Sequence, residues 1–562
     1  MRIFLIPFAY LLLLFRAAPI KVAKADDFSS DGGQPTTLKS SQPGSILSRH
    51  PLSNLRKPGT SAFVISCILV GLALRVVLHF VAYPFFADDA YIFLRYDRNA
   101  LQGMGLSYNP GEHVLGFTSP LYLILLLSQG WILGTGSLTA AALWTNLLLF
   151  GLLVWCAARL EAINYPGLPI TPIFLCIYYP FVDGSLNGME TTLFCVSFIS
   201  AVLASSSGRP NLAVVLGALA LLVRPEGIAV LMGVIFFECF IRKSGPWRGI
   251  TAGLVILTGW SAFSLATYGT VLPQSMLAKS AHVTGQYYGG WMLGPLPLFL
   301  QLAFGLSNDS YSAVPSFGKL GLAVCGFAMT LVTAYGVRNW KRSNSALLLL
   351  PAVFLSNYLI YLLGKPVGIF SWYAIPTSLV FWASAVLGSR ALLKRPRWRM
   401  TTAAGLVLLG IVSLLSIWQG ANKRSGGLAH TGMAFEVTKL LHSKYPDAKS
   451  VLVGDIGVIG YFGEWRIVDL AGLVTPSVLE KGVDGDIVSI AEIIEREVPD
   501  ILLLRDDPRK QASNNDAMVR RATFRSAAER EEFEMQYQEL PADPRSYHVI
   551  FVRRALWRQN VE

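Results

Sequence analysis

The sequence predicts a multispanning α-helical membrane protein that ends in a small soluble α/β domain. Of its 562 residues, 53% are hydrophobic and only 15% are charged, which is far from the balance of a soluble globular protein. Apolar runs of about twenty residues recur along most of the chain, long enough to cross a bilayer as helices. The last part differs, because its charge density rises and its apolar runs shorten to strand length.

The first 60 residues are expected to form an N-terminal extension. Residues 1–15 resemble the core of a signal peptide and "VAKA" resembles a cleavage site, but Arg16 and Lys21 interrupt the pattern. The Ser, Gly, Pro and Thr content of residues 26–60 predicts a disordered linker. We therefore expect an extension that is either not cleaved or begins upstream of the true start, and leave its presence in the mature protein open.

Residues 61–420 are predicted to form the membrane domain, with roughly 11–13 helices. The clearest spans are residues 62–83, 140–157, 250–266, 320–335, 346–363 and 401–418. Short basic clusters lie between the apolar runs, as expected for cytoplasmic loops under the positive-inside rule. They are residues 241–248, 338–342 and 389–399.

The basic residues also predict orientation. Taking Arg56 and Lys57 as cytoplasmic puts the end of the first helix, and a polar, aromatic loop at residues 84–118, on the outer face. A cytoplasmic cluster at residues 389–399 sends the last helix outward, so the soluble domain, residues 421–562, reaches the same face. We expect a multi-pass protein of the cytoplasmic membrane whose active site and C-terminal domain are periplasmic or extracellular. Between residues 118 and 242 the sides do not alternate cleanly, which predicts that one apolar segment between residues 120 and 159 is re-entrant or only half-inserted.

Several function classes are disfavoured. The formal net charge is +12, but the basic residues sit in loops between apolar runs, so no nucleic-acid partner is expected. The 6 cysteines lie in or beside apolar segments without metal-ligand spacing, which favours buried small side chains over a disulfide framework or zinc site. The glycines of residues 454–463 lack dinucleotide spacing, so they favour a tight strand-to-helix turn, and no nucleotide cofactor is expected.

The tail is predicted to be an α/β domain. Its apolar runs at residues 450–455, 500–505 and 547–554 have the length of strands. These runs alternate with helical patterns, at residues 432–445 before the first run and at residues 487–498 before the second.

The stretch "YPFFADDAYIFLRYDRN" places two adjacent carboxylates, Asp88 and Asp89, after an apolar run. Adjacent carboxylates repel one another and persist most readily beside a cation or when one is protonated. One interpretation is a solvated helix start with an Asp N-cap. The other makes them catalytic, one as a general base and one or both as ligands of Mg²⁺ or Mn²⁺. His113 is a candidate third metal ligand, although a loop histidine is more often neither ligand nor base.

A further set of charged and aromatic residues is predicted to bind substrate, because guanidinium and ammonium groups suit phosphate and ionisable groups among apolar helices are functional hypotheses. These residues are Arg95, Glu190, Arg224, Glu226, Lys279, Trp372 and Tyr373. Two alternatives stay open. Glu226 and Arg224 are equally interpreted as an internal ion pair, and the two aromatic residues as anchors at the membrane interface.

Residues 87–120, "ADDAYIFLRYDRNALQGMGLSYNPGEHVLGFTSP", are similar to the first external loop of bacterial GT-C membrane glycosyltransferases, especially the terminal β-(1→2)-arabinofuranosyltransferases of mycobacterial cell walls. Later pieces follow in a similar order: "GMET", "RPEG", "YGTVLPQSMLAK", an aromatic "WY" before a proline, then "GDIGVIGYF" and "VDLAGLVTP" in the tail. The resemblance spans about residues 62–547.

The resemblance implies a GT-C fold and transfer of a sugar from a polyprenyl-phosphate donor on the outer side of the membrane. The aspartates of the family's first external loop are catalytic and metal-associated, which carries over to Asp88 and Asp89 without saying which is the base. His113 and Leu115 depart from the family pattern after "GE", and "LPQSMLAK" lacks its Asn and aromatic pair. The sugar, arabinofuranose or another pentose or hexose, and the envelope glycan or lipid acceptor therefore stay open.

The expected mechanism is inverting displacement. Asp88 or Asp89 deprotonates the acceptor hydroxyl, while a metal and Arg224 or Lys279 stabilise the departing lipid phosphate. Two rivals remain. A flippase for a lipid-linked sugar would have charges near the bilayer midplane and internal repeats, whereas an envelope-assembly scaffold would need the tail and not the aspartates.

Overall fold

The computed structural model describes residues 58–559, except residues 83, 279–293, 344, 365–368, 426–429, 481–487, 505–523, 525, 542–545 and 547. The chain divides into Met1–His50 and Pro51–Glu562, and every described residue belongs to the second unit. The expected N-terminal extension lies outside the described residues, apart from residues 58–60. These three residues already belong to the first helix.

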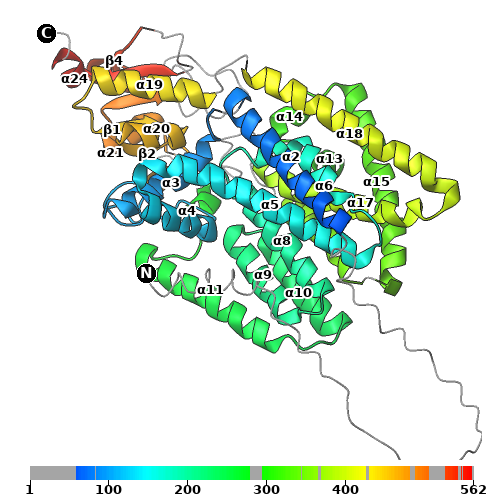
Figure 1. The fold of residues 1–562 in the computed structure, drawn as a ribbon. Coiled ribbons are helices and arrows are strands. Elements are labelled where there is room, and N and C mark those ends of the chain that lie inside the picture. Colours follow the sequence, from blue (N-terminus) through cyan, green and yellow to red (C-terminus); the bar gives the residue numbers. More distant parts are fainter. Residues whose placement is uncertain are drawn as a thin grey trace, which may run out of the picture. The chain divides into compact units, whose positions relative to one another are not determined.

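Seven helices of the described part are long and apolar enough to cross a membrane. They are α2 (Pro58–Ala82), α5 (Leu138–Asn164), α11 (Trp247–Tyr268), α15 (Ser316–Ser343), α16 (Leu349–Gly364), α17 (Ser371–Leu393) and α18 (Pro396–Ser425). Figure 1 shows α2, α5, α17 and α18 near one another, whereas α11 lies on the far side of the region, against α9 (Pro210–Val223). The prediction of a multispanning helical membrane protein is confirmed, and all six clearest predicted spans correspond to members of this group.

Shorter helices complete the region. They are α3 (Asp88–Leu101), α4 (Pro120–Leu133), α6 (Thr171–Ile177), α7 (Tyr179–Gly184), α8 (Thr191–Ser206), α9 (Pro210–Val223), α10 (Gly227–Phe236), α13 (Pro295–Phe304) and α14 (Asn308–Ser312), with short turns η2 (Thr135–Ser137), η3 (Phe237–Ile241) and η4 (Ser345–Leu348). Five of these helices are apolar and 10–17 residues long. Within the described residues, the predicted count of spans is reached only if these shorter helices are included.

The helices α8, α9 and α10 form a packed group whose members are short. With 16 and 14 residues, α8 and α9 are about 24 and 21 Å long, less than the roughly 30 Å of a bilayer's hydrocarbon core. The break between α9 and α10 has a local cause, because Arg224 precedes Pro225 and is extended, with φ −154° and ψ 144°. The half-inserted segment expected from the charge pattern lies between residues 120 and 159, which α4 and α5 occupy, so it stays a prediction.

The C-terminal domain is built on a five-stranded sheet in the order β2-β1-β3-β5-β4. Its strands are β1 (Ser450–Val453), β2 (Arg466–Asp469), β3 (Ile501–Leu504), β4 (Tyr537–Glu539) and β5 (Val549–Arg553). Strand β1 pairs in parallel with β2 and β3, whereas β5 pairs antiparallel with β3 and β4. In this register Val451 lies between Ile467 and Ile501, which are all fully buried.

Helices precede, separate and follow the strands along the chain. They are α19 (His430–Lys444), α20 (Ile456–Gly463), η5 (Pro476–Leu479), α21 (Ile490–Glu497), α23 (Ala527–Gln536) and α24 (Arg554–Gln559). The three predicted strands correspond to β1, β3 and β5, and the predicted strand-to-helix turn is the step from β1 to α20. The prediction of a C-terminal α/β domain is confirmed.

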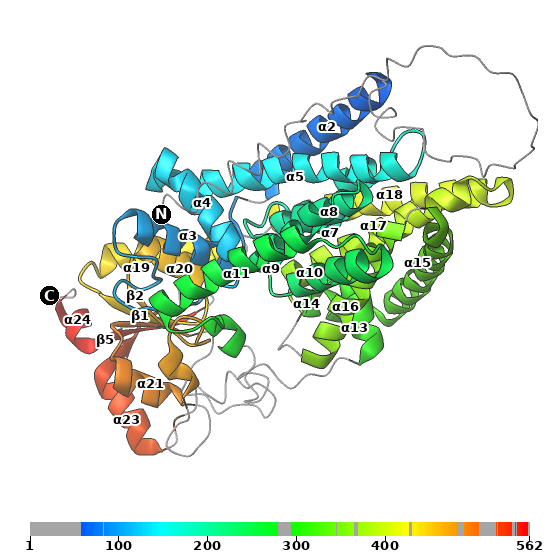
Figure 2. The ribbon, with the colours of Figure 1, turned by 90° about the horizontal axis from the view of Figure 1, so that it is seen from below.

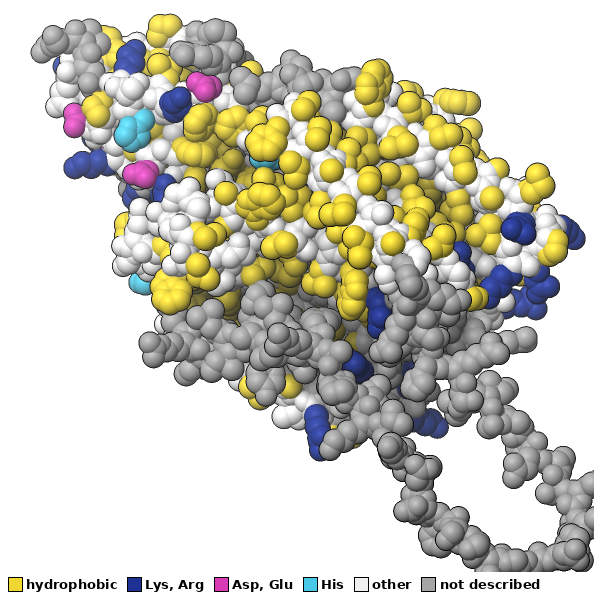
Figure 3. All heavy atoms as spheres, viewed as in Figure 1, with side chains coloured by type: hydrophobic (Ala, Val, Ile, Leu, Met, Phe, Trp, Pro, Cys, Tyr) yellow, Lys and Arg dark blue, Asp and Glu magenta, His cyan; other side chains and the backbone are white. Residues whose placement is uncertain are grey.

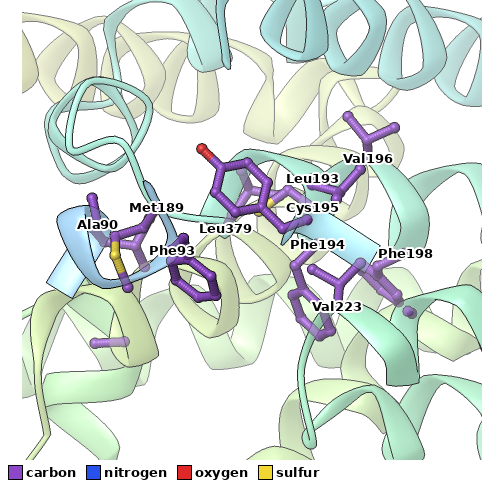
Figure 4. Packing of buried hydrophobic residues seen from close by; sticks show 14 of the residues in the cluster. Ala90, Phe93, Met189, Leu193, Phe194, Cys195, Val196, Phe198, Val223 and Leu379 are labelled. Atoms are coloured by element: carbon purple, nitrogen blue, oxygen red, sulfur yellow. The ribbon is translucent and has the colours of Figure 1, made fainter. Parts of the chain in front are cut away.

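The surface and the core match this division. Hydrophobic side chains cover the helical region on the face in Figure 3, and a group of Lys and Arg side chains lies at its end away from the C-terminal domain. Phe80 and Leu148 are 76% and 73% exposed, as expected for side chains that contact lipid. Inside, Ala90 and Phe93 of α3 lie close to Met189, at the approach to α8 (Figure 4). The helix that carries the two aspartates is therefore packed into the core.

Helix α20 of the C-terminal domain packs against α3. Both views of the ribbon show the two helices side by side (Figures 1 and 2). This contact joins the soluble domain to the segment that bears the two predicted catalytic residues.

Candidate active site

A small pocket brings together residues from six parts of the chain. Its volume is about 40 Å³, the scale of a few water molecules. Its lining residues are Asp89, Ile92, Phe93, Gly116, Phe117, Thr118, Met189, Glu190, Ser275, Trp372, Tyr373 and Leu473. Four residues predicted from the sequence, Asp89, Glu190, Trp372 and Tyr373, therefore share one pocket.

Asp88 and Asp89 occupy the first turn of α3. The N-cap residue is Ala87, and no side chain caps this helix. The Ala87 amide donates to the Asn187 carbonyl at 2.9 Å, which ties the start of α3 to the segment before α8. Carboxylates in the first turn of a helix are favoured by its dipole. The interpretation of the pair as an Asp N-cap of its own helix is therefore wrong in detail, because both residues lie inside the helix.

The Asp88 carboxylate caps a different helix, α20. Its Oδ2 accepts a hydrogen bond from the Gly457 amide at 2.8 Å, and its Oδ1 accepts one from the Val458 amide at 2.9 Å. Burial and the nearby Asp455 carboxylate raise the pKa of Asp88 to about 7, although the two amide hydrogen bonds favour the charged form. Asp88 is thus directed at the C-terminal domain and does not line the pocket, while Asp89 does.

Arg95 also lies at the contact with the C-terminal domain. Its guanidinium is buried and donates to the backbone carbonyls of Tyr108 at 2.7 Å, Gly460 at 2.6 Å and Trp465 at 2.6 Å. A fourth hydrogen bond, at 3.2 Å, reaches Asn109 Oδ1. Arg95 is not among the pocket-lining residues, so its predicted substrate contact stays a prediction that this placement does not favour.

Behind the pocket, Arg224 bridges two carboxylates. Its Nη1 lies 2.5 Å from Glu190 Oε1, and its Nη2 lies 3.1 Å from Glu226 Oε1. The Tyr361 hydroxyl donates to the same Glu226 oxygen, and the guanidinium lies 4.9 Å from the Tyr373 ring centre. The alternative of an internal ion pair between Arg224 and Glu226 is confirmed, with Glu190 as an additional member.

This buried group, Glu190, Arg224, Glu226 and Tyr361, is here termed the ionic cluster. Two carboxylates share one guanidinium, so the fully ionised cluster has an excess of negative charge. Within the described residues, Glu190 Oε2 is buried and has no hydrogen-bond partner. Because Glu190 also lines the pocket, this oxygen is the part of the cluster suited to contact a ligand cation or hydroxyl.

The predicted aromatic contacts lie at the start of α17. Trp372 stacks on Phe370 with ring centres 4.8 Å apart and planes inclined by 5°. Both Trp372 and Tyr373 are half-buried in the pocket wall. An aromatic wall in a pocket with a few polar groups is typical of small-molecule sites, and this placement favours the substrate-contact interpretation over simple membrane anchors.

A loop of the C-terminal domain completes the wall through Leu473. Asp469, at the end of β2, holds this loop. Its Oδ1 accepts from the Ala471 amide at 2.7 Å, and its Oδ2 accepts from the Leu473 amide at 2.6 Å. Burial raises the pKa of Asp469 to about 7, against three amide hydrogen bonds, and the charge of Asp89 adds to the rise. Sequence reasoning did not single out Asp469, although its segment "VDLAGLVTP" carried part of the resemblance.

The predicted metal ligands are not brought together as a set. His113 is exposed, and no group of three or more His, Cys, Asp and Glu side chains suited to a metal occurs among the described residues. Both Asp88 oxygens accept amide hydrogen bonds, as described above. The hard oxygen donors that fit Mg²⁺ or Mn²⁺ at the pocket are those of Asp89 and Glu190. Lys279 lies outside the described residues.

Comparison with known proteins gives two kinds of match. The model of a family described as a domain of unknown function, DUF8728, matches residues 422–552. A terminal β-(1→2)-arabinofuranosyltransferase of Mycobacterium tuberculosis is 30% identical over 270 residues, which is 42% of this chain and 43% of that protein. A protein of the same name from Corynebacterium glutamicum is 28% identical over 298 residues, 44% of this chain and 42% of that protein. Each match therefore covers less than half of the relative's length.

Proposed function

Because the chain is a relative of the terminal β-(1→2)-arabinofuranosyltransferases, we propose that it is a membrane glycosyltransferase. In this proposal it transfers a sugar, arabinofuranose or another pentose or hexose, from a polyprenyl-phosphate donor to a hydroxyl of a cell-envelope glycan or lipid. The observation that carries the proposal is the pocket in which Asp89, Glu190 and Trp372 meet. It combines an acid–base group, a buried carboxylate and an aromatic wall in one place.

The position of the pocket beside short apolar helices supports a lipid-linked donor. The ionic cluster sits at the ends of α8, α9 and α10, which are shorter than a membrane span. In this proposal the site lies near the hydrocarbon boundary, where a polyprenyl tail would remain in the bilayer while its phosphate reaches polar groups. Such a donor is already activated by phosphate, so the reaction requires no nucleotide site.

We assign Asp89 as the general base. In the proposed step it takes the proton of the acceptor hydroxyl, the hydroxyl oxygen bonds to the anomeric carbon, and the bond from that carbon to the phosphate oxygen breaks. Attack from the face opposite the phosphate inverts the anomeric centre. Asp89 lines the pocket, whereas both oxygens of Asp88 accept hydrogen bonds from α20, which supports Asp89 over Asp88 in this role.

The departing phosphate needs positive charge. Arg224 is already shared by two carboxylates, so it does not offer an uncompensated cation to the pocket. One oxygen each from Asp89 and Glu190 would hold Mg²⁺ or Mn²⁺, which would neutralise charge on the phosphate. The small volume of the pocket means that a sugar ring displaces side chains of the wall as it binds.

Orientation forms part of the proposal. The group of basic side chains at the end of the helical region away from the C-terminal domain (Figure 3) supports a cytoplasmic position for that end. The pocket and the C-terminal domain would then face the periplasm or the exterior.

Transfer by the purified protein in nanodiscs tests the proposal. Radiolabelled polyprenyl-phosphate sugars serve as donors and envelope extract as acceptor, with and without EDTA. We expect one donor to be used, and Asp89→Asn to lower kcat by about 100-fold or more, the usual size of a general-base effect. Asp447→Asn, at an exposed site of the C-terminal domain, is the matched control. Unchanged activity of Asp89→Asn would contradict the assignment.

One observation favours a second function. Short helices that end at a buried ionic cluster also occur in transporters, so a lipid-linked sugar flippase remains the alternative. Movement of a lipid-linked sugar between vesicle leaflets, without transfer to any acceptor, would support that function.

A further inference from the structure

Helix α3 presents three charged residues to α20, and together they match its two ends. Asp88 binds the amides of the first turn, while Arg95 donates to Gly460 and Arg98 donates to the Tyr461 carbonyl. The first amides and last carbonyls of a helix lack partners within it, and its dipole favours an anion at the start and cations at the end. The ends of α20 are therefore satisfied by α3.

The first turn of α20 is capped by a residue that is distant in sequence, not by its own N-cap residue. Asp455 occupies the N-cap position of α20, yet it makes no side-chain capping hydrogen bond. Asp88, 369 positions before Gly457 in the chain, accepts the hydrogen bond of the Gly457 amide instead. The beginning of α20 is thus completed only when the C-terminal domain lies against α3.

Two glycines allow this close contact. A Cβ atom at Gly457 would lie 1.8 Å from the Asp88 carbonyl oxygen, and one at Gly460 would lie 2.0 Å from the Tyr108 hydroxyl oxygen. Either atom would be too close to its neighbour, and the first neighbour is backbone. Side chains at these positions would therefore force α20 away from α3.

The contact continues from α20 to the pocket. The chain passes from α20 into β2, where Asn109 exchanges two hydrogen bonds with the Ile467 backbone, at 2.8 and 3.0 Å. The loop that follows β2 is held by Asp469 and contributes Leu473 to the pocket wall. The Leu473 carbonyl would lie 3.0 Å from a Cβ atom at Gly116, so this wall has little freedom to move inward.

We propose that Asp88 is a positioning residue of the transferase: by capping α20 it docks the C-terminal domain on α3 and so fixes Leu473 in the wall of the pocket. The inference rests on the proposed function, because it concerns the pocket in which transfer is proposed. It also gives a role to the region that matches a domain of unknown function. That region becomes a structural part of the pocket, and Asp88 acts through it without touching the reacting atoms.

The test combines hydrogen exchange with kinetics on the full chain in nanodiscs. We compare Asp88→Ala, Gly457→Ala and the double variant. We expect each single change to speed amide exchange in α20 about tenfold, the size of a lost helix cap. With envelope extract as acceptor, the apparent KM should rise by a similar factor while kcat changes less. The double variant should be no worse than the worse single variant, because both changes break one contact.

The two readouts separate the failure of this inference from failure of the proposed function. Exchange in α20 requires no donor or acceptor, so it reports docking even if no sugar is transferred. Unchanged exchange in Asp88→Ala overturns the inference whatever the activity. A loss of kcat of about 100-fold or more with exchange unchanged would make Asp88 a chemical participant.

Two further variants guard against simple misfolding. Arg98→Gln weakens the other end of the contact, where Arg98 is bonded to the Tyr461 carbonyl and pairs with the exposed Glu464 at 3.2 Å. It should give the same pattern with a smaller effect. Asp447→Asn should change neither exchange in α20 nor KM. Fast exchange throughout the C-terminal domain in Arg98→Gln, with KM unchanged, would contradict the link between docking and the pocket.

Discussion

The ionic cluster and the contact between α3 and α20 both contain buried carboxylates, but they compensate them differently. In the ionic cluster Arg224 lies 2.5 Å from Glu190 and 3.1 Å from Glu226. Asp88 at the domain contact and Asp469 in the adjoining pocket loop accept hydrogen bonds from backbone amides, and burial raises the pKa of each to about 7. One region is held by opposite charge and the other by amide dipoles, with protonation near neutral pH. The first should respond mainly to loss of a partner, and the second also to pH.

The largest expected effect breaks the ionic cluster. Arg224→Met leaves Glu190 and Glu226 buried without their cation, and breaking a buried ion pair in this way costs about 3–5 kcal/mol. We expect loss of folded protein in detergent, measured by size-exclusion chromatography and thermal unfolding.

A matched triple variant sharpens this result. Combining Arg224→Met with Glu190→Gln and Glu226→Gln removes all three charges, so it should recover much of the lost stability. If Arg224→Met alone unfolds at the wild-type temperature, the ion pairs do not hold this region together.

A smaller effect is expected at the pocket loop. Asp469→Ala leaves the Ala471 and Leu473 amides without their acceptor, and an unsatisfied buried donor costs about 1–3 kcal/mol. Amide exchange in residues 470–475 should speed up, while the ionic cluster keeps its stability. Asp447→Ala provides the control, and equal exchange in both variants would show that Asp469 does not hold the loop.

A pH dependence of the domain contact is also expected. The pKa of Asp88 in the folded state, about 7, exceeds the value of about 3.9 in an unfolded chain. Its contribution is therefore complete below about pH 4 and is lost as pH rises through about 7. The groups whose charges act on Asp88 are Asp455 and Asp89. The pKa of Asp469 is also raised, so its contribution to stability changes with pH in the same direction. The charge that acts on it is that of Asp89.

Thermal unfolding of the C-terminal domain between pH 4.5 and 8 measures this dependence. The unfolding temperature should fall as pH rises, and Asp88→Asn should flatten the slope because it removes one titrating group. A slope that is identical in the variant would assign the pH dependence to other groups.

Much of the fold could be predicted from the sequence because its causes are local. Apolar length predicts the spans, and short apolar runs predict β1, β3 and β5. Strand β2 was missed, since its four residues, Arg466–Asp469, form a short run between charged and glycine residues. The shortness of the helices α8 and α9 was not predicted. Their length is local, but the ionic cluster at their ends depends on packing.

The candidate site divides in the same way. The sequence predicts site roles for Asp89, Glu190, Trp372 and Tyr373 from their chemical types alone. The structure places all four in the wall of one pocket. Asp88 and Arg95 carry the same chemical signal in the sequence, yet they contact α20. Only the three-dimensional structure distinguishes these roles, because the partner amides lie more than 300 positions away along the chain. No local pattern reports such a partner.

The central claim is that Asp89 performs chemistry while Asp88 positions the pocket. Single-turnover transfer at saturating envelope extract, with Asp89→Asn and Asp88→Asn compared side by side, tests it most directly. The structure predicts a loss of about 100-fold or more for Asp89→Asn, and a loss below about tenfold for Asp88→Asn. The reverse order, with Asp88→Asn the more damaged enzyme at saturation, would contradict the claim.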